Sequence, residues 1–310
     1  MNHSETVLKF PELHGVLFPG CGVTFTGYEN VFLQKSGCDI KQLFRRASGC
    51  SSFKIPEPVC TRDDEYDELQ NQLLTYIYSC AFSDILRNIH PNVSWCAFYS
   101  MGIYAALYHA GVYTFESGLK LIETAYTAVM AAKGTVSYAI ATIIGLERAT
   151  VEKHIAYSGG MLDIINENNG LSFVVCGENT RVTQLVDAVT DDGAIKAVIL
   201  PLSAPYHAVK DLSKLESLKL CCDNVIVSAP NVKMVSCVDQ TILDTTDTIK
   251  HTILDNVALP INWRKTFELL LGNDGTEFFE CGPGDSLYKA GKFIDGTFTI
   301  TGCRKYSALM

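Results

Sequence analysis

Three short runs with apolar residues at their centres each stop at a tight turn, and this arrangement limits most strongly the folds open to the chain. The runs span residues 15–18, 93–98 and 277–280, and glycine, proline or serine residues follow each of them. Short apolar runs bounded by such residues are typical of buried strands. Segments with helical spacing separate the runs, and strands that alternate with helices favour an α/β fold.

The middle of the chain alternates more closely between the two patterns. Strands are predicted over 138–144, 171–176 and 194–200, and helices over 148–159 and 179–190. This alternation indicates a small α/β unit inserted in a larger domain. Outside it, the spacing predicts helices over 68–88, 100–110, 208–220 and 244–257, a helix that opens at Thr114, and a strand over 224–228.

Charge and composition exclude several classes of function. The 310 residues include 25 Lys and Arg against 34 Asp and Glu, which gives a net charge of −9. Phosphate backbones bind basic surfaces, so we expect no nucleic-acid partner. No window approaches the ~18 uncharged apolar residues of a membrane span, and the start of the chain has no signal-peptide pattern. We therefore expect a cytoplasmic protein without membrane contact.

The twelve cysteines are scattered along the chain, without a CxxC pair. Adjacent Cys221 and Cys222 cannot both face one zinc ion without ligands from elsewhere, and no HExxH motif occurs. We predict reduced thiols and no metal site.

Ser100 follows a predicted strand and opens a predicted helix, with Gly102 two residues later. A serine in such a turn has an exposed hydroxyl, and the first amides of the helix point towards whatever it attacks. The alternative is a serine that only caps the helix. The G-x-S-x-G pattern is half met, because Phe98 stands in place of its first glycine.

A serine nucleophile needs a base, and seven histidines compete for that role. His109 lies nine positions after Ser100, about 180° around the same helix. His3, His14, His90, His154 and His251 lie near the N-terminus, in a loop or in charged helical stretches. His207 follows the strand over 194–200 in a loop with two prolines, where sites of open α/β sheets are found. Its alternative role is a loop histidine bonded to a carbonyl.

Five segments of the sequence, taken in order, resemble malonyl-CoA:acyl carrier protein transacylases and polyketide synthase acyltransferases. They are Leu17–Gly22, the Ser100 segment as far as Val112, Ser203–His207, Leu259–Trp263 and Glu280–Gly284. The resemblance covers nearly the whole chain. It implies an α/β-hydrolase-like large domain with a parallel sheet, at 1–130 and 200–310. A ferredoxin-like α+β subdomain would be inserted at 131–199.

The resemblance also implies a ping-pong acyl transfer in which Ser100, activated by His207, forms an acyl ester. Asn256 matches the family residue whose main-chain carbonyl orients the histidine. The amides of Cys21 and Met101 match the family's oxyanion hole. An acyl carrier protein with its phosphopantetheine thioester is the implied partner, acyl-CoA is a possible donor, and we expect a monomer without a cofactor.

Five positions depart from the family pattern, and three of them concern the substrate pocket. Cys21 replaces a glutamine, Phe98-Tyr99 a Gly-His pair, and Ile103 a glutamate. Ala125 stands where malonyl-specific members carry the arginine that binds the substrate carboxylate. An unpaired buried carboxylate costs several kcal/mol, so we predict a pocket of Tyr99, Ile103, Ala125 and Tyr206 that prefers uncharged acyl groups.

The chain thus resembles the arginine-less members that hydrolyse stalled acyl chains in trans-acyltransferase polyketide synthases. Lys120 or Lys133 could replace the missing arginine. Three other functions also stay open: a transacylase that loads carrier proteins, a catalytically weak module that binds a carrier protein, and an α/β-hydrolase esterase. The acid of such an esterase would be Asp163, Asp191 or Asp192. Glu123, near Ala125 in sequence, would add to the repulsion of malonate. Cys21 is interpreted as a small apolar filler rather than a reactive thiol.

Overall fold

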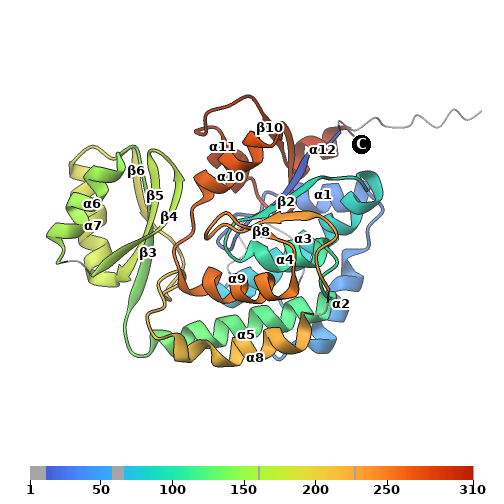
Figure 1. Cartoon of the computed structure of the whole chain (residues 1–310), viewed down its shortest axis with the longest axis horizontal. Helices are drawn as coiled ribbons and strands as arrows, with labels where there is room; N and C mark the ends of the chain where they lie inside the picture. Colours follow the sequence, from blue (N-terminus) through green and yellow to red (C-terminus); the bar gives the residue numbers. More distant parts are fainter. Residues whose placement is uncertain (1–11, 58–65, 160, 227, 310) are drawn as a thin grey trace, which may run out of the picture.

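The computed structural model describes residues 12–57, 66–159, 161–226 and 228–309, and their strands form two separate sheets (Figure 1). The larger sheet has the order β10-β9-β1-β2-β7-β8. Its first five strands pair in parallel, and β8 is antiparallel to β7. The strands are β1 (Gly15–Phe18), β2 (Trp95–Phe98), β7 (Lys233–Val235), β8 (Ile242–Leu243), β9 (Glu277–Glu280) and β10 (Thr299–Thr301). The predicted α/β class is confirmed.

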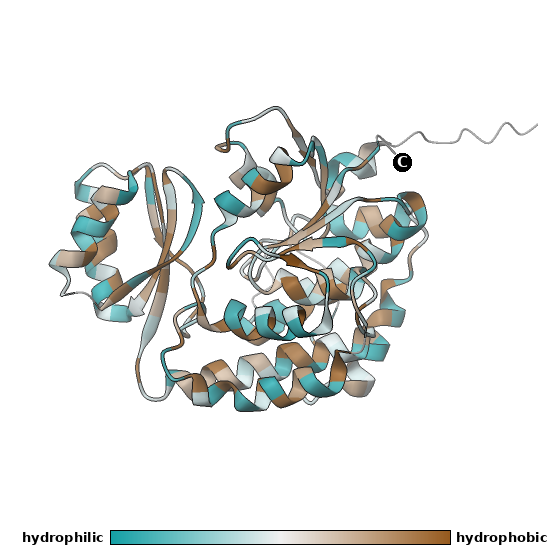
Figure 2. Cartoon of the chain, viewed as in Figure 1, coloured by the Kyte–Doolittle hydropathy of each residue, from teal (hydrophilic) through white to brown (hydrophobic). Residues whose placement is uncertain are grey.

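The large domain surrounds this sheet with helices. They are α1 (Tyr28–Lys35), α2 (Ile40–Cys50), α3 (Glu68–Ile89), α4 (Gly102–His109), α5 (Phe115–Lys133), α8 (Glu216–Val225), α9 (Thr246–Ala258), α10 (Trp263–Gly272), α11 (Ser286–Gly291) and α12 (Cys303–Leu309). Thr114 caps α5 as predicted, because its hydroxyl accepts from the Ser117 amide at 3.3 Å. Figure 2 shows apolar and polar residues alternating along the outer helices α5 and α8.

Both faces of the large sheet are covered, because side chains alternate along each strand. Val16 and Phe18 of β1 belong to the main core, which also contains residues of α3, α4 and α5. Leu17 points to the opposite face, where Trp263 and Phe267 of α10 cover the sheet. The result is a three-layer domain with the carboxyl ends of β1 and β2 at one edge.

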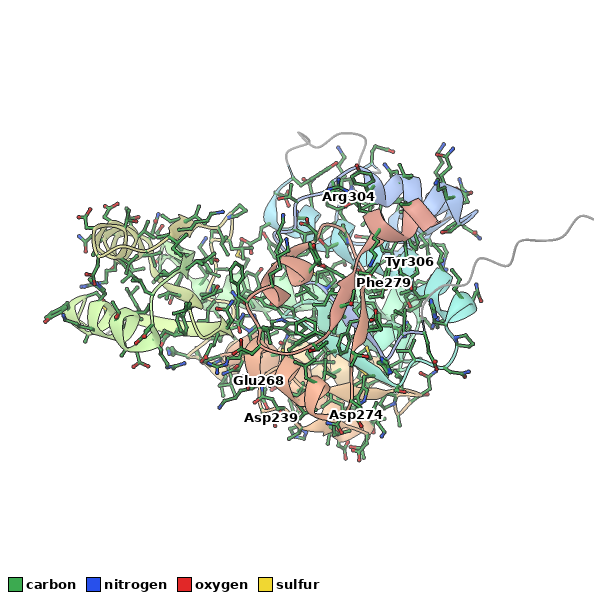
Figure 3. All side chains as sticks on the ribbon, turned by 90° about the horizontal axis from the view of Figure 1, so that it is seen from above. Asp239, Glu268, Asp274, Phe279, Arg304 and Tyr306 are labelled. Carbon is green, nitrogen blue, oxygen red and sulfur yellow. The ribbon has the colours of Figure 1, made fainter. Side chains whose placement is uncertain are left out.

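The C-terminal helix α12 packs against the large sheet at strand β9. Its Tyr306 packs edge-on against Phe279 of β9, with ring centroids 4.6 Å apart (Figure 3). Edge-to-face aromatic pairs at this spacing contribute beyond their buried area.

The second sheet is a βαββαβ unit with strand order β4-β5-β3-β6, paired antiparallel throughout. Its elements are β3 (Tyr138–Ile144), α6 (Arg148–Tyr157), β4 (Leu162–Asn169), β5 (Ser172–Glu178), α7 (Asn179–Asp191) and β6 (Lys196–Ile199). This order and connectivity are those of a ferredoxin-like subdomain. All its elements lie inside the predicted range 131–199, whose end points stay a prediction.

The two faces of the small sheet have different neighbours. One packs on α6 and α7 through Val151, Val182 and Leu185. The other carries Ile140 and Val174 and packs against Ala208 of the large domain. This second face is apolar and turned towards the large domain, so it can form one wall of a cavity.

The structure corrects several predicted elements. The strand predicted over 224–228 is wrong, because helix α8 continues to Val225. The next strand is β7, which begins at Lys233. Residue 227 lies outside the described residues. The helix predicted over 208–220 begins as a 3-10 turn at Leu212–Leu215. Strand β4 was not predicted, since five of its eight residues are Asp, Asn or Glu.

Within the described ranges, the eleven cysteines are all free, and no group of three or more His, Cys, Asp or Glu side chains is placed to hold a metal ion. Cys60 and His3 lie outside those ranges. None of the described helices is both long and apolar enough to cross a membrane.

Candidate active site

Ser100 lies in the turn between β2 and α4, at the carboxyl edge of the large sheet. Its φ is 54°, in the left-handed region that non-glycine residues rarely adopt. The Ser100 carbonyl accepts a hydrogen bond from the Ile103 amide at 3.1 Å, which closes the first turn of α4. This strained strand-turn-helix geometry is typical of a nucleophile elbow.

The Ser100 hydroxyl faces His207 rather than the helix. Ser100 Oγ and His207 Nε2 lie 2.7 Å apart, whereas α4 has no side-chain cap. This distance lets a neutral imidazole accept the serine proton. The pair therefore has the geometry of a nucleophile and its general base, and the capping alternative for Ser100 is not what the structure shows.

His207 is buried, with 6% of its surface exposed, and its φ of 61° is also left-handed. Burial lowers the pKa of His207 to about 4, and the main-chain carbonyls of Asn256 and Leu259 oppose that shift to a smaller extent. Nδ1 has no well-formed hydrogen bond to any described residue. Burial thus holds the imidazole neutral, and the orienting role of the Asn256 carbonyl remains a prediction.

This shift predicts how activity depends on pH. Protonation of His207 removes the acceptor for the Ser100 proton, and in the folded protein protonation occurs near pH 4 instead of 6.5. The acid limb of kcat/KM is therefore expected well below pH 6.5. A profile of thioester turnover from pH 4 to 8, with circular dichroism at each pH to exclude unfolding, measures it. A limb centred at pH 6.5 would contradict the assignment.

The C-terminal turn of α9 contacts both members of the pair. Asn256 Nδ2 donates to the Ser100 carbonyl at 3.2 Å, and the His207 amide donates to the Val257 carbonyl at 2.9 Å. Cys237 Sγ donates to Asn256 Oδ1 at 3.2 Å and so fixes which way the amide faces. One helix end thus holds nucleophile and base in their strained conformations.

The remaining described histidines are engaged elsewhere. His109 Nδ1 lies 2.9 Å from Ser83 Oγ, inside the core, and burial lowers its pKa to about 4. His154 pairs with Asp192 at 2.9 Å and His251 with the Asp247 carbonyl at 2.7 Å. Among the histidines in the described ranges, His207 is the one that lines the cavity beside Ser100.

Cys21 lies in the loop after β1, and Met101, directly after the serine, is the N-cap residue of α4. Within the described ranges, neither main-chain amide donates a hydrogen bond to another residue, so both stay available to a ligand. Cys21 also lines the cavity. Two free amides beside a nucleophile match the predicted oxyanion hole, which remains a prediction for this chain.

Ser100 and His207 line a cavity of about 200 Å³ between the large domain and the small sheet. Residues 20–23 and α11 form one side, and the apolar face of the small sheet forms the other, with Ile140, Val174 and Leu200. Tyr99 and Tyr206, both predicted, are among the lining residues. Over the described part of the chain, the lining contains no Arg, Lys, Asp or Glu.

One carboxylate, Glu68 of α3, lies behind this lining. The Tyr206 hydroxyl donates to it, and the Ser203 amide donates at 3.0 Å. Burial, with a smaller contribution from Glu68, raises the pKa of the Cys21 thiol to about 12. The thiol is therefore protonated at neutral pH, which supports the interpretation of Cys21 as a filler.

Comparison with known proteins adds to this geometry. No protein-family model matches the sequence. The malonyl CoA-acyl carrier protein transacylase of Escherichia coli K12 is 28% identical over 213 residues, 68% of this chain and 69% of that one. The chain is thus similar in sequence to a malonyl-CoA:acyl carrier protein transacylase and has the fold of these enzymes. The acyl-carrier-protein S-malonyltransferase of Burkholderia pseudomallei has a TM-score of 0.83 at 24% identity, over 96% of this chain and 99% of its own.

A further transacylase of this fold was solved with its carrier protein. It is a malonyl-transacylase in complex with a type II polyketide synthase acyl carrier protein, with a TM-score of 0.77 at 22% identity. The match covers 94% of this chain and 96% of that one.

Two of the residues that depart from the transacylase pattern, Ala125 and Ile103, lie in the core and not at the cavity. Ala125 and Ile103 are 6% and 0% exposed in the main core, and neither lines the cavity, so their predicted place in the pocket wall is corrected. Both side chains pack in the core of the helical layer instead, Ala125 on α5 and Ile103 on α4. Lys133 donates to Ser203 at 3.2 Å, and Lys120 is exposed.

The place of Glu123 is also corrected. Its carboxylate accepts from the Ser52 amide at 3.2 Å and from the Ser51 hydroxyl, at the end of α2. It is therefore turned away from the cavity and does not act on a bound acyl group there. The acidic group behind the cavity wall is Glu68, which sequence reasoning did not single out.

Sequence reasoning also missed Asn166, Asn168 and Cys237. The two asparagines line the cavity from β4, a strand hidden by its polar composition. Their spacing of two residues, after Leu162 and Ile164, is the one signal that was available. For Cys237 the sequence holds no such signal, because its contact with Asn256 depends on tertiary packing.

Proposed function

We propose that this chain is a serine-dependent acyltransferase that acts on acyl thioesters of an acyl carrier protein, with acyl-CoA as a second possible donor. The observation that carries the proposal is the Ser100–His207 pair, 2.7 Å apart at the wall of a cavity. The carrier protein in the complex with the structurally similar transacylase supports the partner.

The reaction follows from the two side chains. His207 Nε2 takes the proton from Ser100 Oγ while the oxygen attacks the thioester carbonyl. The C–S bond then breaks, and His207 returns the proton to the leaving thiolate. An acyl ester remains on Ser100. Water or a second thiol, deprotonated by His207, attacks this ester and restores the serine.

We further propose that the acyl group is uncharged and that its acceptor is water. Within the described ranges no cation lines the cavity, and Glu68 places a negative charge behind Tyr206. A malonate carboxylate there would be buried without a partner, at a cost of several kcal/mol. The proposed role is hydrolysis of stalled acyl chains in polyketide biosynthesis.

Intact-mass measurement of the acyl-enzyme tests this function directly. The protein is incubated with acetyl-, butyryl- and malonyl-carrier protein, with Ser100→Ala as the control. We expect acetyl and butyryl adducts on the wild type, release of free acid, and no adduct on the variant. A dominant malonyl adduct would overturn the specificity, and transfer to a second carrier protein would identify a loading transacylase.

The catalytically weak module is the remaining alternative, and the same measurement decides it. Phe98, Tyr99 and Cys21 all depart from the family pattern close to the serine, which favours this alternative. Binding of a carrier protein without any adduct or turnover would support it.

Restoring an arginine at position 125 provides a second test. Ala125 itself does not line the cavity, so the test depends on the greater length of an arginine side chain. Ala125→Arg is expected to raise the malonyl-to-butyryl ratio of acylation rates about tenfold, because a guanidinium that extends to the cavity binds a carboxylate in bidentate geometry. Ala125→Met is the control for side-chain size. An equal shift in both variants, or an unchanged ranking in a folded Ala125→Arg protein, would show that charge at this position does not set the preference.

A further inference from the structure

Tyr99, the residue before the nucleophile, reaches across to the small subdomain. Its hydroxyl donates to Asn168 Oδ1 at 2.9 Å and accepts from Asn166 Nδ2 at 2.6 Å. Asn166 Nδ2 also donates to Asn168 Oδ1 at 2.7 Å. These three side chains form a closed polar cluster on the cavity wall.

The same cluster is fixed to the large domain on its other side. The Trp263 amide donates to Asn166 Oδ1 at 3.1 Å, and the Tyr99 ring packs edge-on against Trp263 with centroids 5.7 Å apart. The Ile261 amide donates to the Ile165 carbonyl at 2.9 Å, which adds a main-chain bond between the domains. Strand β4 is thus joined to the loop before Ser100 and to the start of α10.

Irregular pairing of β4 puts both asparagines in place. Its register with β5 shifts between Ile164 and Asn166 and again between Glu167 and Asn169. Bulges of this kind redirect side chains and are common next to active sites. Asn166 is 2% exposed and its polar atoms are all engaged, as expected of a buried network that fixes one arrangement.

We propose that Tyr99 is a positioning residue whose hydroxyl, bound by Asn166 and Asn168, holds the small subdomain against the loop before Ser100 and thereby sets the shape of the acyl cavity. The proposal rests on the proposed function. Because one cavity wall is the apolar face of the small sheet, loosening this contact changes the space open to the acyl chain. Tyr99 then determines which chain lengths are accepted without taking part in the chemistry.

The experiment compares Tyr99→Phe, Asn168→Ala and the double variant with the wild type, using acetyl-, butyryl- and octanoyl-carrier protein. We expect Tyr99→Phe to lower kcat/KM for butyryl about tenfold and to change the octanoyl-to-butyryl ratio at least threefold. The loss of kcat/KM in the double variant is expected to be no larger than the loss in the less active of the two single variants. Both substitutions remove the same hydrogen bond between Tyr99 and Asn168. Additive losses or an unchanged ratio would overturn the proposal.

Tyr78→Phe is the matched control, because the Tyr78 hydroxyl donates to Asn30 Oδ1 at the same 2.9 Å, away from the cavity lining. It is expected to lower the melting temperature and leave the chain-length ratio unchanged. Hydrogen exchange of β4 provides a readout independent of activity. Faster exchange in Tyr99→Phe supports the contact even if no substrate acylates Ser100, and unchanged exchange counts against it.

Discussion

Replacing Ser100 with glycine is expected to abolish acyl transfer and at the same time stabilise the protein. Loss of the nucleophile should lower kcat/KM by roughly four orders of magnitude or more. Glycine adopts the positive φ of 54° without strain, so the free energy of unfolding should rise by about 1 kcal/mol. Thioester hydrolysis and urea denaturation of the same preparation measure the two effects.

Ser100→Ala separates the two effects. Alanine also lacks the hydroxyl, but it keeps the strained backbone, so activity should be lost without the gain in stability. Equal stability of the two variants would indicate that the turn is not strained, and appreciable turnover by either would show that Ser100 is not the nucleophile.

Gly102→Ala is expected to have the largest effect on stability among the substitutions considered near the site. A methyl group there would overlap the Phe18 carbonyl and lie 2.8 Å from the Pro19 carbonyl oxygen. These atoms are main chain and have little room to move, so we expect a loss of about 3 kcal/mol in the free energy of unfolding. Activity should fall as well, since the displaced segment leads to the Cys21 amide. Chemical denaturation and thioester turnover measure both.

Gly49→Ala is the matched control within a helix. Nothing lies within 4 Å of a methyl group at this position, and alanine favours the helical conformation. We expect unchanged activity and a stability equal to or slightly above the wild type. A Gly102→Ala protein as stable as Gly49→Ala would show that the β1 and α4 segments are not in the close contact described.

The parts of the site that sequence reasoning predicted are those with a local signal. Ser100 was found because strand, turn and helix patterns meet around it, and His207 because it follows a strand and the other histidines lie in less suitable segments. Local signals failed for β4, where Asn166 and Asn168 replace apolar residues, and for α1 and α2, whose polar and mixed sequence hid them.

The remaining errors concern depth in the fold. Ala125 and Ile103 were assigned to the pocket from the resemblance to the family pattern, but the packing of α4 and α5 places both inside the core. Glu68 contacts Tyr206, which lies 138 positions away in the chain. Cys237 contacts Asn256, which lies 19 positions away. Such contacts leave no pattern in a single sequence.

The cavity is lined by residues of both the large domain and the inserted subdomain, and this has a consequence for how its substrate preference can change. Ser100, Asn256 and His207 belong to the large domain, whereas Ile140 and Val174 on the opposite wall come from the inserted subdomain. Under the proposed function, the groups that make and break bonds and the groups that select the acyl chain therefore lie in separate stretches of the chain. We therefore expect that exchange of the inserted subdomain would alter the accepted acyl group and leave the proposed reaction unchanged.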